Sequence, residues 1–260
     1  MSYADAVHET AVIDPSAALA DDVQVGPYTV IGPNVRIGAG SVIGPHVHIV
    51  RDTTLGEGVR VHHGAAVGGD PQDLKYANEP TQLVVGSNTV IREFVTLNRG
   101  TSAHGRTEIG ESCLLMAYAH VAHDCIIGNN VILANSVNMG GHVTIEDHVI
   151  VGGLTAIHQF VRIGRHAFVG GSAAVMKDVP PFVKAAGNPL KLYGLNSVGL
   201  QRRGFSEETR MTLKRAYRMI FSSSLNIGQA LKQAEAELVV TPDVQHFLSF
   251  IEASQRGVTV

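Results

Sequence analysis

The feature of the sequence that most constrains its fold is a six-residue repeat. Stepping by six from Val7 reaches thirty positions up to residue 181, and 26 of these are Val, Ile, Leu or Met. Only Asp73, Glu79, Ala103 and Pro181 break the series. The residue directly after each of these positions is often Gly, and the residue four positions after each is small or β-branched. A period of six fits neither an α-helix nor simple strand alternation, but it fits short β segments separated by tight corners.

Three such segments form a coil of eighteen residues, which stacks into a triangular prism. This pattern resembles the hexapeptide repeat of the left-handed parallel β-helix acyltransferases. The left hand is what the resemblance implies, because the general rule for crossover connections favours the right hand. Residues eighteen apart should stack in adjacent coils about 4.8 Å apart. We therefore expect an all-β solenoid plus α, with a left-handed parallel β-helix over residues 1–189.

Two polar stretches interrupt the repeat without changing its phase. They cover residues 69–83 and 102–107. Loops that project from a solenoid often carry function. We therefore expect both stretches to project from the prism and to contribute to function.

The repeat ends after residues 187–189, and helix signals follow. Three helix starts are each marked by a capping residue: Ser206, Asn226 with Gln229 three residues later, and Thr241 before Pro242. The first of these helices should run to about Phe221, and Gly257 could close the third. The pattern predicts a small C-terminal helical domain over residues 190–260.

The composition limits the classes of function. A formal net charge of −3 gives no general case for binding nucleic acid. No run of about eighteen apolar residues exists that could span a membrane. Residues 1–5 lack a basic region followed by an apolar core, so no signal peptide is expected. The two cysteines, Cys113 and Cys125, occupy small inward positions and make no disulfide framework. A cytoplasmic protein is expected.

The stretch from Ala119 to Cys125 concentrates residues that can do chemistry. Stacking by eighteen sets Gly141 over His123 and His142 over Asp124. The next coil brings two more polar side chains to the same side of the prism: His158 and Gln159. Glycine at 141 would leave backbone N–H groups accessible beside His123.

This cluster suits acyl transfer to a hydroxyl group. A neutral histidine is a good general base near pH 7. A neighbouring carboxylate can fix the tautomer of the ring, and an N–H one coil away can stabilise an oxyanion. No Gly-x-Ser-x-Gly motif is present, so direct attack by a substrate hydroxyl is favoured over a covalent enzyme intermediate. Two other hypotheses stay open: a zinc site built from histidines, as in the β-helical carbonic anhydrases, and a non-catalytic trimeric scaffold.

The sequence is also similar, nearly from end to end, to the UDP-N-acetylglucosamine acyltransferase family, which carries out the first step of lipid A biosynthesis. The most specific matches lie outside the hexads, in the polar loop and near the C-terminal helices. The similar stretches are residues 72–77 and 79–81, Ile91-Arg-Glu93, Arg99-Gly-Thr101, His120-Val-Ala-His-Asp124, Gly141-His142, His158-Gln-Phe160, Asp178-Val-Pro-Pro181 and Arg202-Arg-Gly-Phe205.

The resemblance implies a homotrimer with active sites in clefts between neighbouring prisms. It implies transfer of a 3-hydroxyacyl chain from acyl carrier protein to the 3-hydroxyl of UDP-N-acetylglucosamine. His123 would then be the general base, Asp124 its orienting partner and the Gly141 N–H the oxyanion donor. Substrate contacts would come from the polar loop, the cleft and the C-terminal region: Gln72, Asp73, Lys75, His120, His142, His158, Gln159, Asn196, Arg202 and Arg203. No metal is expected, and no cofactor beyond the phosphopantetheine of the carrier protein.

Two positions depart from the pattern of the family. Asn98 stands where many members have His, and Val198 stands where some have a carboxylate. The first puts in doubt a secondary histidine in the cleft, and the second a part of the nucleotide contact. The related N-acyltransferase of the same pathway carries an additional N-terminal domain, for which hexads beginning at Val7 leave no room.

Two further expectations concern the donor. The acyl carrier protein of this family is acidic, so it should dock on the basic residues of the C-terminal part: Lys191, Arg202, Arg203, Arg210, Lys214, Arg215 and Arg218. The resemblance also points to Gly171 as the residue that limits the acyl chain. Gly153 and Gly171 leave the groove open, so we expect a chain of about twelve to fourteen carbons, lying along coils spaced about 4.8 Å apart, rather than ten.

Overall fold

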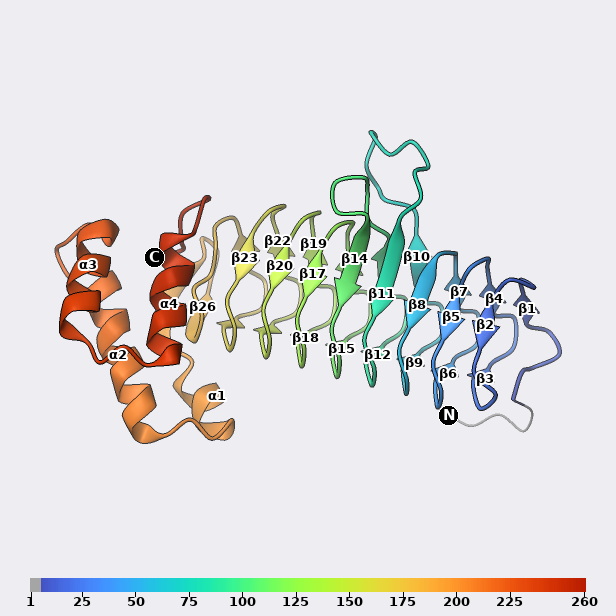
Figure 1. The fold of residues 1–260 in the computed structure, drawn as a ribbon, viewed down its shortest axis with the longest axis horizontal. Helices are drawn as coiled ribbons and strands as arrows, with labels where there is room; N and C mark the ends of the chain where they lie inside the picture. Colours follow the sequence, from blue (N-terminus) through green and yellow to red (C-terminus); the bar gives the residue numbers. More distant parts are fainter. Residues whose placement is uncertain (1–5) are drawn as a thin grey trace.

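The computed structural model describes residues 6–260 as a triangular prism followed by helices (Figure 1). The three faces of the prism are sheets of nine, eight and ten strands. The nine-stranded sheet contains β1 (Val12–Ile13), β4 (Val30–Ile31), β7 (His48–Ile49), β10 (Ala66–Gly69), β13 (Thr96–Asn98), β16 (His120–Val121), β19 (Asn138–Met139), β22 (Ala156–Ile157) and β25 (Ala174–Val175). The eight-stranded sheet contains β2 (Ala18–Leu19), β5 (Arg36–Ile37), β8 (Thr53–Leu55), β11 (Gln82–Val85), β14 (Arg106–Ile109), β17 (Ile126–Ile127), β20 (Thr144–Ile145) and β23 (Arg162–Ile163). The ten-stranded sheet contains β3 (Gln24–Val25), β6 (Val42–Ile43), β9 (Arg60–Val61), β12 (Val90–Ile91), β15 (Leu114–Leu115), β18 (Ile132–Leu133), β21 (Ile150–Val151), β24 (Phe168–Val169), β26 (Val183–Ala186) and β27 (Lys191–Leu195).

The prediction of a left-handed parallel β-helix with a small helical C-terminal part is confirmed. Successive coils pair in parallel with a register of eighteen, as between Val12 and Val30. From Val25 to Val175 the aliphatic residues at the hexad positions point inward and are almost completely buried, for example Ile43 and Leu115. Removing such a side chain leaves a cavity and typically costs about 2–5 kcal/mol.

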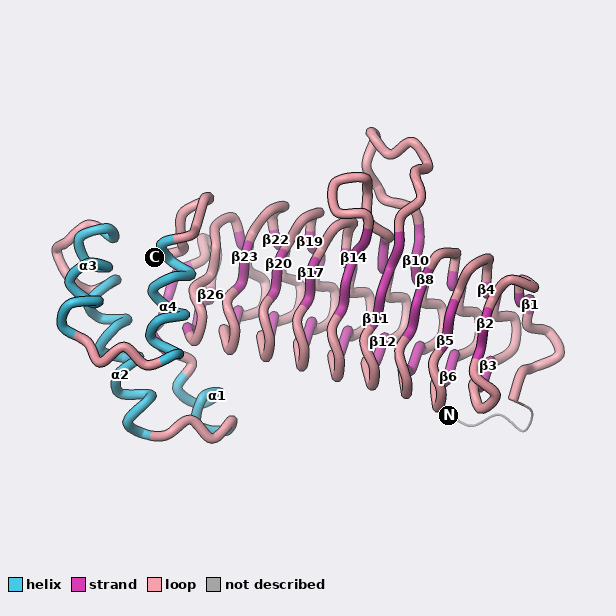
Figure 2. The backbone as a smooth tube through the Cα atoms, in the orientation of Figure 1, coloured by secondary structure: helices cyan, strands magenta, loops and turns pink. Residues whose placement is uncertain are grey.

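The register explains why the two interruptions keep the phase of the repeat. Leu97 pairs with Val67, thirty positions earlier, and with Val121, twenty-four later. The first interruption therefore adds two hexads to a coil and the second adds one. The loops themselves are residues 70–81 and 99–105, so the predicted limits 69–83 and 102–107 were only partly right. Residues 82–83 and 106–107 belong to β11 and β14, and the second loop begins at Arg99. Both loops project side by side from the same edge of the prism (Figures 1 and 2).

The corners of the prism use a backbone conformation that most residues avoid. Asp124, His142 and Phe160 have φ of 58°, 61° and 64°, in the left-handed region. Hydrogen bonds between coils support them: the His142 N–H donates to the His123 carbonyl and the Phe160 N–H to the Gly141 carbonyl. The side chains of successive coils are thus stacked along one edge.

The C-terminal region differs from the prediction in three ways. Residues 191–195 form β27, which pairs antiparallel with β26, so helical structure starts only at α1 (Ser197–Arg202). The helix α1 itself was not predicted. The other helices are α2 (Glu207–Phe221), α3 (Ile227–Glu237) and α4 (Pro242–Glu252), with the predicted caps Ser206, Asn226 and Thr241. The last helix ends at Glu252, so the prediction that Gly257 closes it was wrong.

Polar contacts fasten the helices to the prism. Arg165 on the prism pairs with Asp243 at 2.9 Å, and His246 of α4 contacts Glu146 at 2.7 Å. The buried carboxylate of Asp178 accepts a hydrogen bond from the Ser254 hydroxyl at 2.7 Å. In residues 6–260 no helix is long and apolar enough to cross a membrane.

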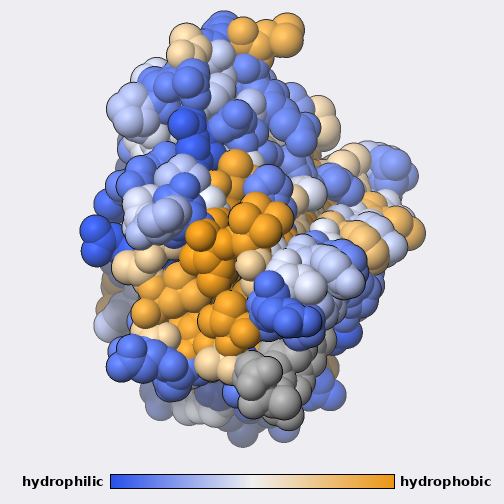
Figure 3. All heavy atoms as spheres, turned by 90° about the vertical axis from the view of Figure 1, so that its right-hand side faces the viewer, coloured by the Kyte–Doolittle hydropathy of each residue, from blue (hydrophilic) through white to orange (hydrophobic). Residues whose placement is uncertain are grey.

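The opposite end of the prism, beside β1, carries hydrophobic side chains at its surface (Figure 3). Ala11, Ile13, Ala17 and Leu19 pack against the core there but stay partly exposed, because within residues 6–260 no earlier coil lies over them.

Candidate active site

The candidate site lies on the edge of the prism below the two loops, where three corner residues stack. The rings of His142 and Phe160 are parallel, with centroids 4.6 Å apart. His142 also meets the ring of His123 edge-on at 5.1 Å. Asp124 completes the stack, with its Oδ2 3.8 Å from His142 Nε2. The placing of His142 over Asp124 is the one expected from a spacing of eighteen residues.

Asp124 is held in one orientation by three donors. Its Oδ2 lies 2.8 Å from His123 Nδ1. The Thr101 N–H donates to Oδ1 at 2.9 Å, and the Thr101 hydroxyl donates to Oδ2 at 2.7 Å. The Asp124 side chain has no exposed area. Burial alone would raise the pKa of Asp124, but the hydrogen bonds from Thr101 and His123 outweigh it and hold the pKa below its usual value. Asp124 is therefore an ionised acceptor at neutral pH.

The charge on Asp124 sets the tautomer of His123. An ionised carboxylate can only accept, so in the neutral ring of His123 the proton lies on Nδ1, and Nε2 is the nitrogen that can accept a proton. The His123 side chain is 14% exposed, which keeps Nε2 within reach of a substrate. The pair thus has the arrangement of a general base and its orienting partner.

Gly141 lies directly over the imidazole of His123. A Cβ atom at this position would collide with the ring, at 2.7 Å from Nε2 and 2.9 Å from Nδ1. Only glycine therefore fits above His123 in its present position. Within residues 6–260 the Gly141 N–H donates to no other group. An available N–H beside a base is what an oxyanion site needs.

The other predicted cleft histidines surround this pair. The Nδ1 atom of His120 lies 2.7 Å from the Thr96 hydroxyl, and burial and the nearby His123 lower the pKa of His120. Burial also lowers the pKa of His142, against the attraction of Asp124. Both rings are therefore neutral at pH 7 and can donate or accept hydrogen bonds.

On the next coil, His158 and Gln159 lie at the rim of the same edge. His158 Nδ1 is 3.0 Å from the carbonyl of Gln159 and 3.2 Å from Arg256 Nη2. The contact with Arg256, from the chain after α4, was not predicted. The sequence offers no local signal for it, because the two residues are 98 positions apart.

The loop of residues 70–81 brings Gln72, Asp73 and Lys75 to this edge. Gln72 and Lys75 are exposed and Asp73 is partly buried. Asp73 Oδ1 accepts the N–H of Lys75 at 2.9 Å, which fixes the turn. The charge of Asp73 is close enough to act on His142, whose pKa it tends to raise. Asp73 is therefore within electrostatic reach of the histidine cluster.

The predicted nucleotide contacts form a second group on the prism near α1. A cavity of about 320 Å³ is lined by Asn196, Val198 and Arg202, but not by Arg203 or His123. Asn196 caps α1 and donates to the His166 carbonyl at 3.0 Å. Arg203 Nη1 contacts His148 Nδ1 at 2.7 Å. Within residues 6–260, this cavity near α1 is lined by no member of the His123 cluster.

The structure shows the surroundings of Asn98, which departs from the family pattern, and of Gly171, the predicted limit of the acyl chain. Asn98 is 6% exposed and its Nδ2 donates to the carbonyl of Asp70 at 2.6 Å. Its side chain supports the projecting loop, and within residues 6–260 it makes no hydrogen bond to the histidine cluster. Gly171 is an exposed corner residue stacked on Gly153, where a Cβ would approach the Gly153 carbonyl to 2.9 Å.

His123, Asp124 and His142 offer three ligand atoms within 4.8 Å of one another, close enough to consider a metal ion. The hydrogen bonds argue for a different use. Both Asp124 oxygens already accept from Thr101 or His123. A metal would have to displace these donors, so the donor set fits a histidine–aspartate pair better than a zinc centre.

Three residues of the site were not assigned roles from the sequence: Thr101, His104 and Phe160. The His104 ring, from the second loop, lies 5.5 Å from that of His142. Thr101 and Phe160 belong to stretches that drew attention, but only the corner stacking and the shape of the loop reveal their contacts.

A hexad prism with a histidine–aspartate pair at one of its corners is the architecture of a hexapeptide-repeat acyltransferase. Two family models match the chain: the bacterial transferase hexapeptide repeat at residues 106–141, and domain 2 of UDP-N-acetylglucosamine O-acyltransferase at residues 178–259. The chain belongs to the acyl-[acyl-carrier-protein]–UDP-N-acetylglucosamine O-acyltransferase family.

The relatives support this assignment over almost the whole length. The enzyme of that name from Myxococcus xanthus is 51% identical over 254 residues, which cover 97% of this chain and 98% of the relative. The one from Janthinobacterium sp. is 51% identical with the same coverage. Among solved structures, LpxA from Acinetobacter baumannii has a TM-score of 0.94 at 44% identity and covers 98% of this chain and 100% of its own. The acyltransferase from Bacteroides fragilis has a TM-score of 0.95 at 38% identity, covering 97% and 99%.

Proposed function

We propose that this protein transfers a 3-hydroxyacyl chain from acyl carrier protein to the 3-hydroxyl of UDP-N-acetylglucosamine, the first step of lipid A biosynthesis. The observation that carries the proposal is the 2.8 Å contact between His123 Nδ1 and Asp124 Oδ2, with Asp124 itself fixed by Thr101. It leaves Nε2 as the nitrogen that can accept a proton, beside the Gly141 N–H, which has no partner within residues 6–260. The names of the full-length relatives supply the substrates.

The reaction follows from these groups. His123 Nε2 takes the proton of the sugar hydroxyl while the hydroxyl oxygen forms a bond to the carbonyl carbon of the thioester. The Gly141 N–H stabilises the negative charge that develops on the carbonyl oxygen. The carbon–sulfur bond then breaks. If the leaving thiol resembles cysteine, with a pKa of about 8.5, the thiolate leaves with little acid assistance. Asp124 stabilises the imidazolium during the reaction.

The remaining predicted residues bind substrate in this proposal. Gln72, Asp73 and Lys75 hold the sugar nucleotide from the loop, with His120, His142, His158 and Gln159 lining the cleft. Asn196, Arg202 and Arg203 meet the nucleotide or the phosphopantetheine, and Gly171 borders the acyl groove.

The His123 cluster and the residues near α1 lie in different places on one chain. A cleft between neighbouring prisms would bring the two groups together. We therefore also propose a homotrimer, and a cytoplasmic location where acyl carrier protein is available. No cofactor takes part besides the donor's phosphopantetheine.

Mass spectrometry of the products tests the function directly. Purified protein would be incubated with UDP-N-acetylglucosamine and a panel of 3-hydroxyacyl carrier proteins, and the product fragmented to locate the acyl group. An ester at the 3-hydroxyl supports the proposal. Product only with an amino-sugar acceptor would replace it with N-acyl transfer. No product, with tightly held zinc in chelator-washed protein, would replace it with a metal enzyme.

A further inference from the structure

The segment from Asn98 to Thr101 joins the two parts of the site, and each of its residues is anchored. All four are buried, and Arg99 has no exposed area at all. The segment begins at the last residue of β13 and opens the second projecting loop. One end contacts the loop that carries Asp73 and Lys75, and the other end contacts Asp124.

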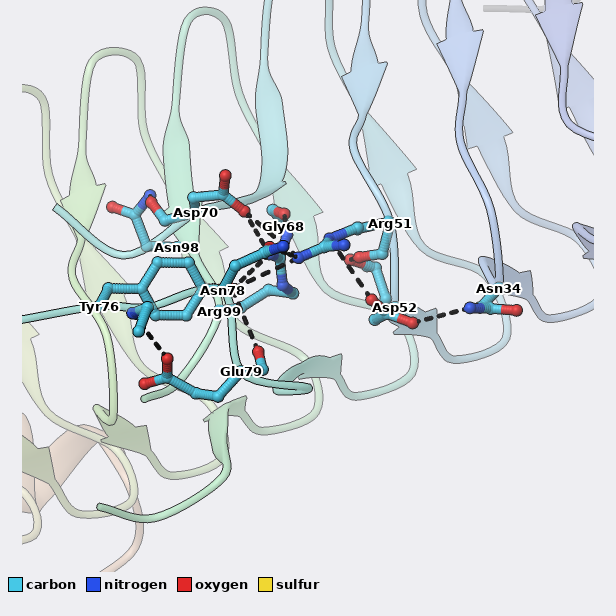
Figure 4. A network of polar contacts seen from close by, with 12 residues as sticks. Asn34, Arg51, Asp52, Gly68, Asp70, Tyr76, Asn78, Glu79, Asn98 and Arg99 are labelled. Carbon is cyan, nitrogen blue, oxygen red and sulfur yellow. Dashed lines mark hydrogen bonds and ion pairs between the residues drawn. The ribbon is translucent and has the colours of Figure 1, made fainter. Parts of the chain in front are cut away.

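Arg99 holds the first loop. Its guanidinium donates to the Gly68 carbonyl, to the Asp70 carboxylate and, at 3.1 Å, to the Tyr76 hydroxyl (Figure 4). Arg51 supports the same loop. It donates to the Tyr76 hydroxyl and, at 2.5 Å, to Asn78 Oδ1. A guanidinium is costly to bury unless its donors are paired. Nη1 and Nη2 of Arg99 are paired, although its Nε is not, and these contacts restrict where residues 70–78 can lie. Asp73 and Lys75 are carried on this anchored stretch.

Thr101 holds the other part of the site. Its N–H and hydroxyl bind the two oxygens of Asp124, and its own side chain is almost fully buried. The Thr101 hydroxyl and His123 Nδ1 both bind Asp124 Oδ2, so Thr101 fixes the position of that oxygen relative to the imidazole. The residue touches no reacting atom and acts only through Asp124.

Gly100 keeps the two anchors close together. A Cβ at this position would collide with the backbone of Arg106 at the start of β14. The Gly100 N–H also donates to the Gln82 carbonyl at 3.2 Å. Arg99 and Thr101 are therefore held on a short, closely packed segment that has little freedom to move.

We propose that Arg99 and Thr101 are positioning residues with separate tasks: Thr101 aligns Asp124 and His123 for proton transfer, and Arg99 sets the loop that binds the acceptor. The proposal rests on the proposed function. It predicts that the two residues affect different kinetic constants although they are two positions apart.

The first arm of the test removes the hydroxyl of Thr101. Thr101→Val should lower kcat by about 10- to 100-fold, the loss expected for a hydrogen bond to a charged group, with KM for the sugar nucleotide within about threefold. Thr101→Ser restores the hydroxyl and should recover most of kcat. The matched control is Thr89→Val, another buried threonine whose hydroxyl donates to the Gly110 carbonyl at 2.8 Å, away from Asp124. It should keep kcat.

The second arm loosens the loop. Arg99→Met, and the milder Asp70→Asn, should raise KM for the sugar nucleotide by about tenfold and change kcat by less than about threefold. Trypsin should cleave after the exposed Lys75 faster in both variants than in wild type or Thr101→Val. The control Arg36→Met alters an exposed arginine of β5 and should leave cleavage unchanged.

The outcomes separate the two proposals. If wild type forms no acylated sugar nucleotide, the proposed function fails, while the trypsin comparison still tests whether Arg99 holds the loop. If the wild type is active but Thr101→Val retains kcat, or Thr101→Ser fails to rescue it, Thr101 has no positioning role. If Arg99→Met and Asp70→Asn leave both KM and trypsin cleavage unchanged, Arg99 does not set the loop.

Discussion

Gly141→Ala is the smallest change that should disable the proposed site. The added Cβ would stand 2.7 Å from His123 Nε2, whereas ordinary contacts begin at 3.4 Å. The Cε1 atom of the same ring would lie closer still, so the ring must retreat by about 1 Å. Misplacing a reacting group by about 1 Å can cost about 100-fold in rate. Since the N–H of residue 141 shifts as well, we expect kcat to fall by roughly 30- to 300-fold.

The assay is the initial rate of acyl transfer at saturating concentrations of both substrates, normalised to folded protein. Gly128→Ala serves as the control, because its Cβ would also collide with the next coil, at Asp147. Gly128 directly follows β17, whereas His123 lies before that strand. That variant should lose stability and keep its kcat. Wild-type kcat in Gly141→Ala, or an equal loss in both variants, would refute the argument that Gly141 is needed to seat His123.

Three more predictions follow from the structure. Gly171→Met should shift kcat/KM toward the ten-carbon donor by about 5- to 100-fold, because overpacking a groove costs about 1–3 kcal/mol; an unchanged ranking of donors would show that the groove does not reach Gly171. Burial, helped by the charges of His148 and Arg203, lowers the pKa of His166 to about 4. Between pH 6.5 and 4 the unfolded chain therefore binds a proton at His166 that the folded chain does not bind, so the free energy of unfolding falls as the pH falls. The difference between the denaturant midpoints at pH 7 and pH 5 should be smaller in His166→Phe than in wild type. An equal difference would assign the effect to other groups. Charge reversal at Arg218, exposed on α2, should raise KM for the carrier protein more than for the sugar nucleotide, and equal changes would argue against docking there.

The sequence predicts the prism and the central pair well because both depend on a simple period. A spacing of eighteen is a distance in a solenoid, so Gly141 over His123 could be placed without coordinates. The corner residues Asp124 and His142 follow from the same arithmetic. The helix caps Ser206, Asn226 and Thr241 are local signals and were equally accessible.

The sequence could not predict contacts between residues whose spacing is not set by the eighteen-residue coil. Thr101 reaches Asp124 from a loop, 23 positions away, and no repeat predicts that spacing. The strand β27 pairs antiparallel at the end of the prism, where the hexad pattern has already stopped. Gly257 resembled a helix end, yet α4 stops earlier and the chain turns back so that the Asp178 N–H donates to the Gly257 carbonyl. These features depend on tertiary contacts, not on local pattern.

The most direct test of the account is the rate of acyl transfer by His123→Ala. The variant would be compared with wild type at saturating 3-hydroxyacyl carrier protein and UDP-N-acetylglucosamine, after confirming the same thermal midpoint and oligomeric state. Loss of a positioned general base typically costs about 10²- to 10⁴-fold, and kcat should fall by that order. Asp124→Asn should cost less if Asp124 only orients the ring. A kcat for His123→Ala within a few-fold of wild type would contradict the assignment of His123 as the base.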